Sequence, residues 1–181
     1  MEKLLSKKAI KVSTEGAFIL LTLVCAVALP QILHGAGVLL GIGGRLGQIL
    51  LPMYLPVLII GFYRGLVSGA LTGLAAPLIS FWITEMPTAV LLPFITIELI
   101  ATGLLAGIFS RSKLPAVLRV LSVVVIAKLG RLIALAISLY ATNGTVSAQV
   151  LFDGILTSVP GVLLQLVLLT ILLTKKEKKY E

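Results

Sequence analysis

Residues 116–140 read AVLRVLSVVVIAKLGRLIALAISLY, an almost unbroken apolar run. A helix that crosses the hydrocarbon core of a bilayer needs about 20 such residues, so this run is long enough to cross it. The whole chain has the same character, because 59% of its 181 residues are hydrophobic and only 12% are charged. An average soluble domain is about 45–50% apolar and about 25% charged. The composition therefore excludes a soluble globular enzyme, a disordered chain and a fibrous protein, and it predicts a protein of the lipid bilayer.

Further apolar runs lie on both sides of this one, and short polar or basic turns separate them. The runs are continuous rather than alternating, which favours an all-α membrane protein over a barrel. The predicted spans cover about 16–33, 50–63, 66–83, 89–109, 116–140 and 154–174. The short turns leave no room for a soluble domain, so residues 1–181 are expected to form a single six-transmembrane-helix bundle. An open alternative is that the first run is a signal peptide, since Ala26-Val27-Ala28 resembles a cleavage site.

The distribution of lysine and arginine predicts the orientation of the bundle. If the N-terminus is cytoplasmic, the inner segments contain Lys3, Lys7, Lys8, Lys11, Arg64, Arg111, Lys113, Arg119, Lys175, Lys176, Lys178 and Lys179, and the outer segments contain only Arg45. Both the N- and C-termini are then cytoplasmic. The net charge of +8 is explained as a topology signal, so no nucleic-acid partner is expected.

Three charged side chains and one amide remain inside the predicted spans: Glu98, Lys128, Arg131 and Gln165. A charge at this depth costs at least about 2.5–3.5 kcal/mol, so these groups are expected to face the bundle interior and to be partnered. With a rise of 1.5 Å per residue, all four fall in one layer roughly 13–18 Å below the outer end. The layer is the predicted substrate-binding site.

The charges of this layer leave three interpretations open. Lys128 and Arg131 supply two positive charges and Glu98 one negative charge, so a monoanionic ligand would neutralise the layer. Alternatively, burial keeps Lys128 neutral. In the third interpretation, Glu98 pairs with Arg131 only to lock the bundle, with no ligand at all.

Candidate binding residues also occur in the first and last of the three predicted outer loops. His34, Arg45 and Gln48 border or lie in a glycine-rich stretch that runs from Gly35 to Gly47 and is too irregular to predict as an ordinary helix. Such a loop could cap an outward-facing pocket, because glycine permits turns closed to other residues. Asn143 in the last outer loop is a further candidate. The alternative for all of them is an ordinary solvated loop.

Several kinds of chemistry lack the residues they need. One cysteine, Cys25, excludes an intrachain disulfide, and one cysteine with one histidine cannot build a metal site. No phosphate-binding loop or hydrolase motif occurs, so we expect no catalytic residues, no cofactor and no ATP hydrolysis by this chain. Gly61, Gly65, Gly69 and Gly73 recur every four residues, and Gly103 and Gly107 repeat the spacing. This pattern predicts close helix packing.

The chain resembles the substrate-binding S components of energy-coupling factor (ECF) vitamin transporters. The resemblance covers the whole layout: six spans, a glycine-rich first outer loop, a short proline-containing second span and both ends inside. The stretch Gly47-Gln48-Ile49-Leu50-Leu51-Pro52-Met53-Tyr54-Leu55-Pro56-Val57, then Gly61 and Glu85-Met86-Pro87, are similar to members of this family.

The resemblance implies a binding subunit in a prokaryotic plasma membrane that captures a small water-soluble vitamin or precursor under the outer loops. Its implied partners are a transmembrane coupling subunit and two cytoplasmic ATPases. The family docks through an Ala-x-x-x-Ala signature in its first span. The nearest match here is Ser13-x-x-x-Ala17 with Gly16 adjacent, which departs from the signature. The positive layer favours an anionic substrate such as pantothenate or niacin.

Two other classes of function stay open. One is a membrane enzyme of lipid acyl or phosphotransfer that uses Glu98 or Asp153 with Arg131. Turnover by the purified protein would support it. The other is a structural subunit without a ligand, in which the Glu98–Arg131 pair only holds helices together.

Overall fold

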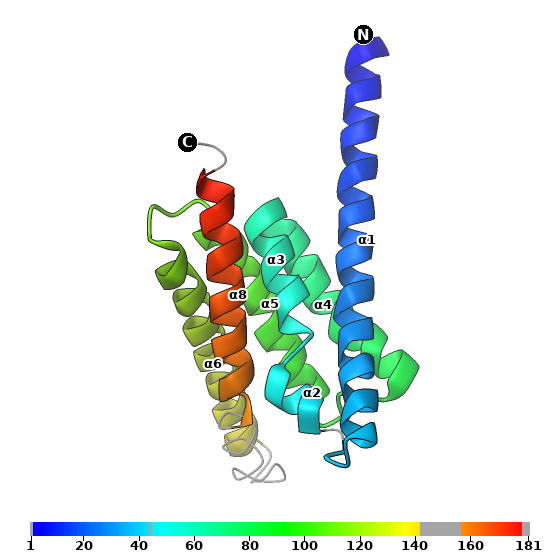
Figure 1. Ribbon diagram of the computed structural model, residues 1–181, viewed down its shortest axis with the longest axis vertical. Coiled ribbons are helices and arrows are strands. Elements are labelled where there is room, and N and C mark those ends of the chain that lie inside the picture. The colour runs from blue at the N-terminus through cyan, green and yellow to red at the C-terminus, as the bar shows by residue number, and fades with distance from the viewer. Residues whose placement is uncertain (1, 44, 142–156, 179–181) are drawn as a thin grey trace.

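The computed structural model describes residues 2–43, 45–141 and 157–178, and all regular elements within them are α-helices. Their bounds are α1 (Glu2–Leu39), α2 (Arg45–Leu50), α3 (Tyr54–Arg64), α4 (Leu66–Thr84), α5 (Leu92–Phe109), α6 (Ala116–Ala141) and α8 (Val159–Lys178). The helices run alternately up and down, so that the beginning of α1 and the end of α8 lie at the same end of the bundle (Figure 1).

Five helices in the described part of the chain are long and apolar enough to cross a membrane. These segments are Thr14–Leu39, Leu66–Thr84, Leu92–Phe109, Ala116–Ile137 and Val159–Glu177. The prediction of an all-helical protein with membrane-spanning character is therefore confirmed. The second predicted span corresponds to α3, which is shorter, and Gly154 at the predicted start of the last span lies outside the described residues.

The short helix α3 is the central element of the core. It packs against α1, α4 and α5, and its side chains Val57, Leu58 and Ile60 are completely buried. Leu51 has a positive φ of 48° and precedes Pro52, so the backbone turns between α2 and α3. Neighbouring helices surround α3, and its own length therefore need not match the membrane thickness.

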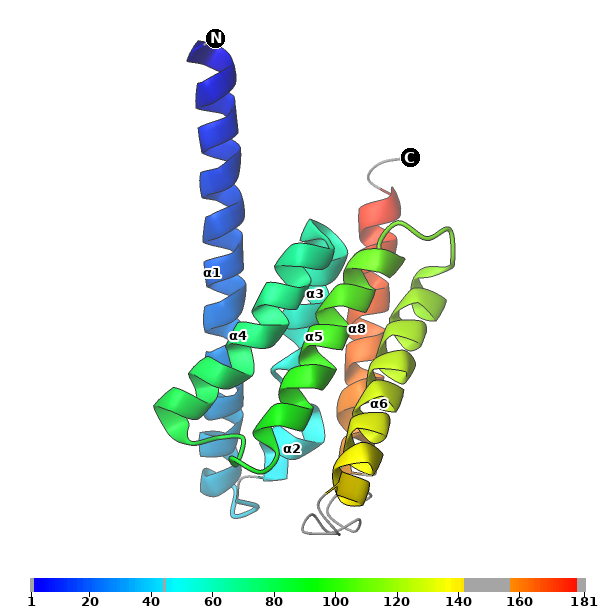
Figure 2. The same ribbon diagram turned by 180° about the vertical axis from the view of Figure 1, so that it is seen from behind.

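The helices α4 and α5 approach so closely that their backbones touch through glycine. A Cβ atom at Gly69 or Gly103 would collide with the backbone of the other residue, and one at Gly73 would collide with the backbone of Leu99. Figure 2 shows α4 and α5 lying next to each other. The predicted packing role of the glycine repeat is thus confirmed for Gly69, Gly73 and Gly103. Gly65, between α3 and α4, instead has a φ of +96°, and a Cβ added there would meet no described atom within 4 Å.

The expectation of an irregular loop from Gly35 onwards is wrong for its first part. The helix α1 continues through Gly35 and Gly37 as far as Leu39, and Gly47 lies inside α2. The chain reverses only around Gly41 and Gly43, whose φ angles are +74° and +63°. A helix tolerates single glycines at a cost of about 1 kcal/mol each, and packing of α1 against α2 offsets that cost here.

Candidate functional site

Glu98 is the centre of a buried charge cluster between α5 and α6. Its side chain is only 1% exposed, and each of its two carboxylate oxygens accepts a bond from a different cation. Arg131 Nη1 donates to Glu98 Oε2 at 2.9 Å, and Lys128 Nζ donates to Glu98 Oε1 at 3.3 Å. The structure therefore brings together the three charges that the sequence placed in one layer.

Helix geometry explains why both cations meet one carboxylate. Lys128 and Arg131 are three residues apart on α6 and so project from the same face. That face packs against α5, where Thr102 lies one turn beyond Glu98 and donates its hydroxyl to the Glu98 backbone carbonyl at 2.7 Å. Both cations of α6 therefore reach the same carboxylate across the contact between α5 and α6.

Two further helices complete the surroundings of Lys128. Ser158, the residue just before α8, accepts a hydrogen bond from Lys128 Nζ through its hydroxyl at 3.4 Å. From α3, the ring of Tyr54 lies 5.9 Å from Lys128 Nζ, measured to the ring centroid, which is within cation–π range. The cluster therefore draws residues from α3, α5, α6 and the start of α8.

Gln165 is buried but does not touch the charged cluster directly. Its amide donates to the backbone carbonyl of Leu51 at 3.1 Å, so it joins α8 to the turn between α2 and α3. Ser158, Gly161 and Gln165 are all buried and form the inward face of α8, as their spacing predicts. Glu98 and Gln165 each lie six residues after the start of their helix, roughly 9 Å from the end of the bundle opposite the chain termini.

Tyr54 is the residue of this cluster that sequence reasoning did not select. It is 7% exposed, and its hydroxyl is buried without a hydrogen-bond partner among the described residues. The Nε atom of Arg131 is also buried and unpartnered there. The sequence feature that could have pointed to Tyr54 was its aromatic hydroxyl just after Pro52, the proline that interrupts a short apolar run.

The outer-loop candidates have different outcomes. His34 lies in α1 rather than in a loop, and its imidazole packs so closely on Gly47 that a Cβ there would be 2.5 Å from Nε2. Its Nδ1 atom is buried without a hydrogen-bond partner in the described part of the chain. Arg45 and Gln48 belong to α2, but their side chains lie outside the described set, and Asn143 and Asp153 fall in a segment outside the described residues.

The predicted docking residues lie on α1 just before Phe18, whose ring contacts the guanidinium of Arg64 at the end of α3. Gly16 and Ala17 are exposed, and no atom lies within 4 Å of a Cβ built on Gly16. Of Ser13, only the backbone is described, within α1. The N-terminal part of α1 extends past the other helices (Figure 1).

The remaining chemistry of the described residues is simple. No three His, Cys, Asp or Glu residues among them are grouped closely enough to hold a metal ion, and Cys25 is a free thiol. The cluster can hold charge, because its two cations exceed its one carboxylate and two polar atoms beside them have no partner among the described residues.

No protein-family model matches this chain, and neither a curated protein nor a solved structure is significantly similar to it.

Proposed function

We propose that the protein is the substrate-specificity (S) subunit of an ECF-type importer in a prokaryotic plasma membrane. In this proposal it binds a small, anionic, water-soluble vitamin or precursor, such as pantothenate or niacin, from the outer face. A transmembrane coupling subunit and two ATPases supply the energy for uptake. The resemblance in sequence suggested this function, and the buried cluster around Glu98 supports it best.

The observation that supports this proposal most strongly is that the cluster contains more positive than negative charge. Lys128 and Arg131 are 20% and 12% exposed, and they share one carboxylate that is 1% exposed. A carboxylate ligand would neutralise the excess positive charge, and it could accept bonds from the unpartnered Arg131 Nε and Tyr54 hydroxyl. Buried polar groups without partners cost about 1–3 kcal/mol each, so satisfying them favours binding.

The two ion pairs suggest a division of labour within the site. Arg131 is the closer partner of Glu98, at 2.9 Å, and fixes its position. Lys128 is held more loosely, with bonds of 3.3 and 3.4 Å to Glu98 and Ser158. We therefore assign the leading ligand contact to Lys128, while Arg131 holds Glu98 through Nη1 and offers only its Nε to the ligand.

A thermal-shift screen of the purified protein against water-soluble vitamins tests this proposal. A true ligand at a hundredfold excess over its Kd is expected to stabilise the fold by about 2.7 kcal/mol. The variants Lys128→Gln and Arg131→Ala both remove the excess charge and should lose most of this stabilisation, whereas Lys113→Gln, at an exposed turn, should retain it. Equal ligand stabilisation of Lys128→Gln, Arg131→Ala and the unaltered protein would remove the cluster as the binding site. A flat screen of protein shown by mass spectrometry to carry no bound ligand would refute the function.

A structural role is the second candidate, because both oxygens of Glu98 are already engaged by cations. In that case the cluster only holds α5 against α6. An exchange of Glu98 and Arg131 keeps the net charge of the cluster and would then keep full activity in cells, whereas a binding site would lose affinity because its hydrogen-bond donors would change position.

The proposed topology has six spans, with α3 as the short second span and both termini in the cytoplasm. In a Cys25→Ala background, a cysteine at the exposed Thr88 should react with an impermeant maleimide in intact cells. A cysteine at the exposed Lys113 should react only after the cells are opened, because the two turns lie at opposite ends of the bundle (Figure 2). The reverse labelling pattern would invert the orientation.

A further inference from the structure

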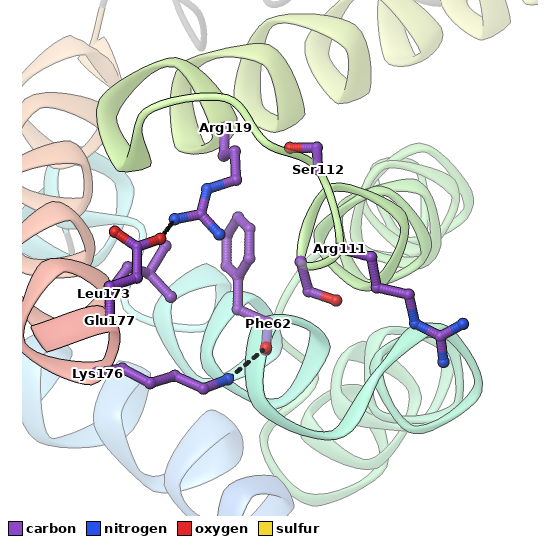
Figure 3. A pocket seen from close by; sticks show the side chains of 8 residues that line it. Phe62, Arg111, Ser112, Arg119, Leu173, Lys176 and Glu177 are labelled. Atoms are coloured by element: carbon purple, nitrogen blue, oxygen red, sulfur yellow. Dashed lines mark hydrogen bonds and ion pairs between the residues drawn. The ribbon is translucent and has the colours of Figure 1, made fainter. Parts of the chain in front are cut away.

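A second polar site lies at the end of the bundle where α1 begins and α8 ends. It is a cavity of about 360 Å³. Side chains from the end of α3, the α5–α6 turn, the start of α6 and the end of α8 line it (Figure 3). Its volume is within the usual range of about 300–1,000 Å³ for small-ligand sites. Ser110 on its wall lies twelve residues after Glu98, roughly 18 Å farther along the bundle. The cavity is therefore separate from the charge cluster.

Cations outnumber carboxylates in the lining of this cavity. The lining contains three cations, Arg111, Arg119 and Lys176, and a single acid, Glu177. The guanidinium of Arg111 points away from the Arg119–Glu177 pair (Figure 3). Arg119 is buried, with 6% of its surface exposed, and pairs with Glu177, whose side chain is 47% exposed. Lys176 donates to the backbone carbonyl of Phe62 at 3.4 Å. The cavity thus keeps an excess of positive charge after its internal ion pair is counted.

Two hydrogen-bond donors of the cavity wall have no partner among the described residues. They are Nε of Arg119 and the hydroxyl of Ser112, both fully shielded from solvent. A buried donor left without an acceptor costs free energy, and protein interiors rarely leave one unsatisfied. The planar guanidinium of arginine matches the oxygens of a phosphate group, which can accept from several donors at once.

We propose that this cavity binds a phosphate group, with Arg119 and Ser112 as its donors and the exposed Arg111 as a further cation at its edge. Glu177 acts as an internal competitor, because its carboxylate pairs with the guanidinium that the phosphate would use. The phosphate can come from the headgroup of an anionic lipid or from a free phosphate ion. A headgroup is in reach because α8 changes at this end from an apolar sequence to Lys175-Lys176, where a spanning helix leaves the hydrocarbon core.

Binding to the delipidated full-length protein, measured by native mass spectrometry, tests this proposal. The probes are phosphatidylglycerol, phosphatidylcholine and inorganic phosphate. Phosphatidylglycerol is expected to bind more tightly than the zwitterionic phosphatidylcholine. Arg119→Gln should weaken its binding by about tenfold or more, the value of a hydrogen bond to a charged group. Glu177→Gln should strengthen binding, because it removes the competing carboxylate.

These opposite signs separate ligand binding from a loss of folding, since both variants break the same ion pair. Arg111→Gln supplies a third test at an exposed side chain, and Lys113→Gln on the same turn is the matched control, because Lys113 is outside the cavity lining. If inorganic phosphate displaces the lipid, the phosphate group alone is the ligand, and if it does not, the lipid headgroup is. Either result supports the site. The proposal is overturned if neither phosphatidylglycerol nor phosphate binds, if Glu177→Gln weakens binding as Arg119→Gln does, or if Lys113→Gln has the effect of Arg111→Gln.

Discussion

Replacing Glu98 by glutamine is expected to cost about 3–5 kcal/mol of unfolding free energy, because it removes the acid from a buried ion pair and leaves its partners unpaired. Arg131 and Lys128 both bond to this carboxylate, and both are mostly buried. Glutamine has nearly the same shape but no charge, so the variant tests the charge and not the packing. Reversible unfolding in mixed detergent micelles would measure the loss.

The matched control is Glu85→Gln, the same substitution at an exposed turn residue in the same protein. It is expected to change stability by less than about 0.5 kcal/mol, as surface substitutions usually do. A Glu98→Gln variant as stable as this control would mean that the two cations find other partners or lose their protons. The cluster would then not be an ion-paired unit, and its assignment as an anion site would lose its charge argument.

The composition and placement of this cluster could be predicted from sequence for a physical reason. Membrane helices contain few charges, so Glu98, Lys128 and Arg131 stand out against an apolar background. The 1.5 Å rise of a helix then converts sequence position into depth. The same reasoning could not select Tyr54, because the sequence alone does not show which side of α3 faces the charged residues after the turn at Pro52.

The cavity lined by Arg119 and Glu177 shows where reasoning from depth alone fails. Arg119 was interpreted only as a topology signal near a span end, yet it is buried and paired with Glu177. These two residues are separated by most of α6, the following segment and nearly all of α8. Their meeting depends on how α6 and α8 pack side by side, which neither residue's local sequence encodes. Positive residues at a span end therefore need not be solvated.

The course of α1 after His34 was mispredicted because glycine content was taken as loop content. A glycine breaks a helix only where the backbone requires a positive φ, as at Gly41 and Gly43. Elsewhere a glycine serves close packing, as at Gly37, where an added Cβ would collide with the carbonyl of Gly43. Sequence alone does not separate these two uses.

Replacing Gly103 by leucine is expected to prevent normal packing of α4 on α5. Even the first atom of a side chain at this position would overlap the backbone of Gly69. Backbone atoms cannot move aside as a flexible side chain can, so the helices must separate. Overpacking of a core typically costs about 1–3 kcal/mol, and contact with backbone places this variant at or above the upper value. Yield of folded protein and unfolding free energy in detergent both measure the effect.

Gly35→Leu is the control for this prediction, because Gly35 is a helical glycine whose added Cβ would meet no described atom within 4 Å beyond its own helical backbone. There the same side chain meets open space, and the better helix propensity of leucine should leave stability unchanged or slightly raised. The difference between the two variants therefore measures the contact of α4 with α5 rather than the general effect of losing a glycine. Equal stability of the two variants would show that these helices can separate at little cost. The position of Glu98 against α6 would then depend on its ion pairs with Lys128 and Arg131 rather than on the close packing of α4 on α5.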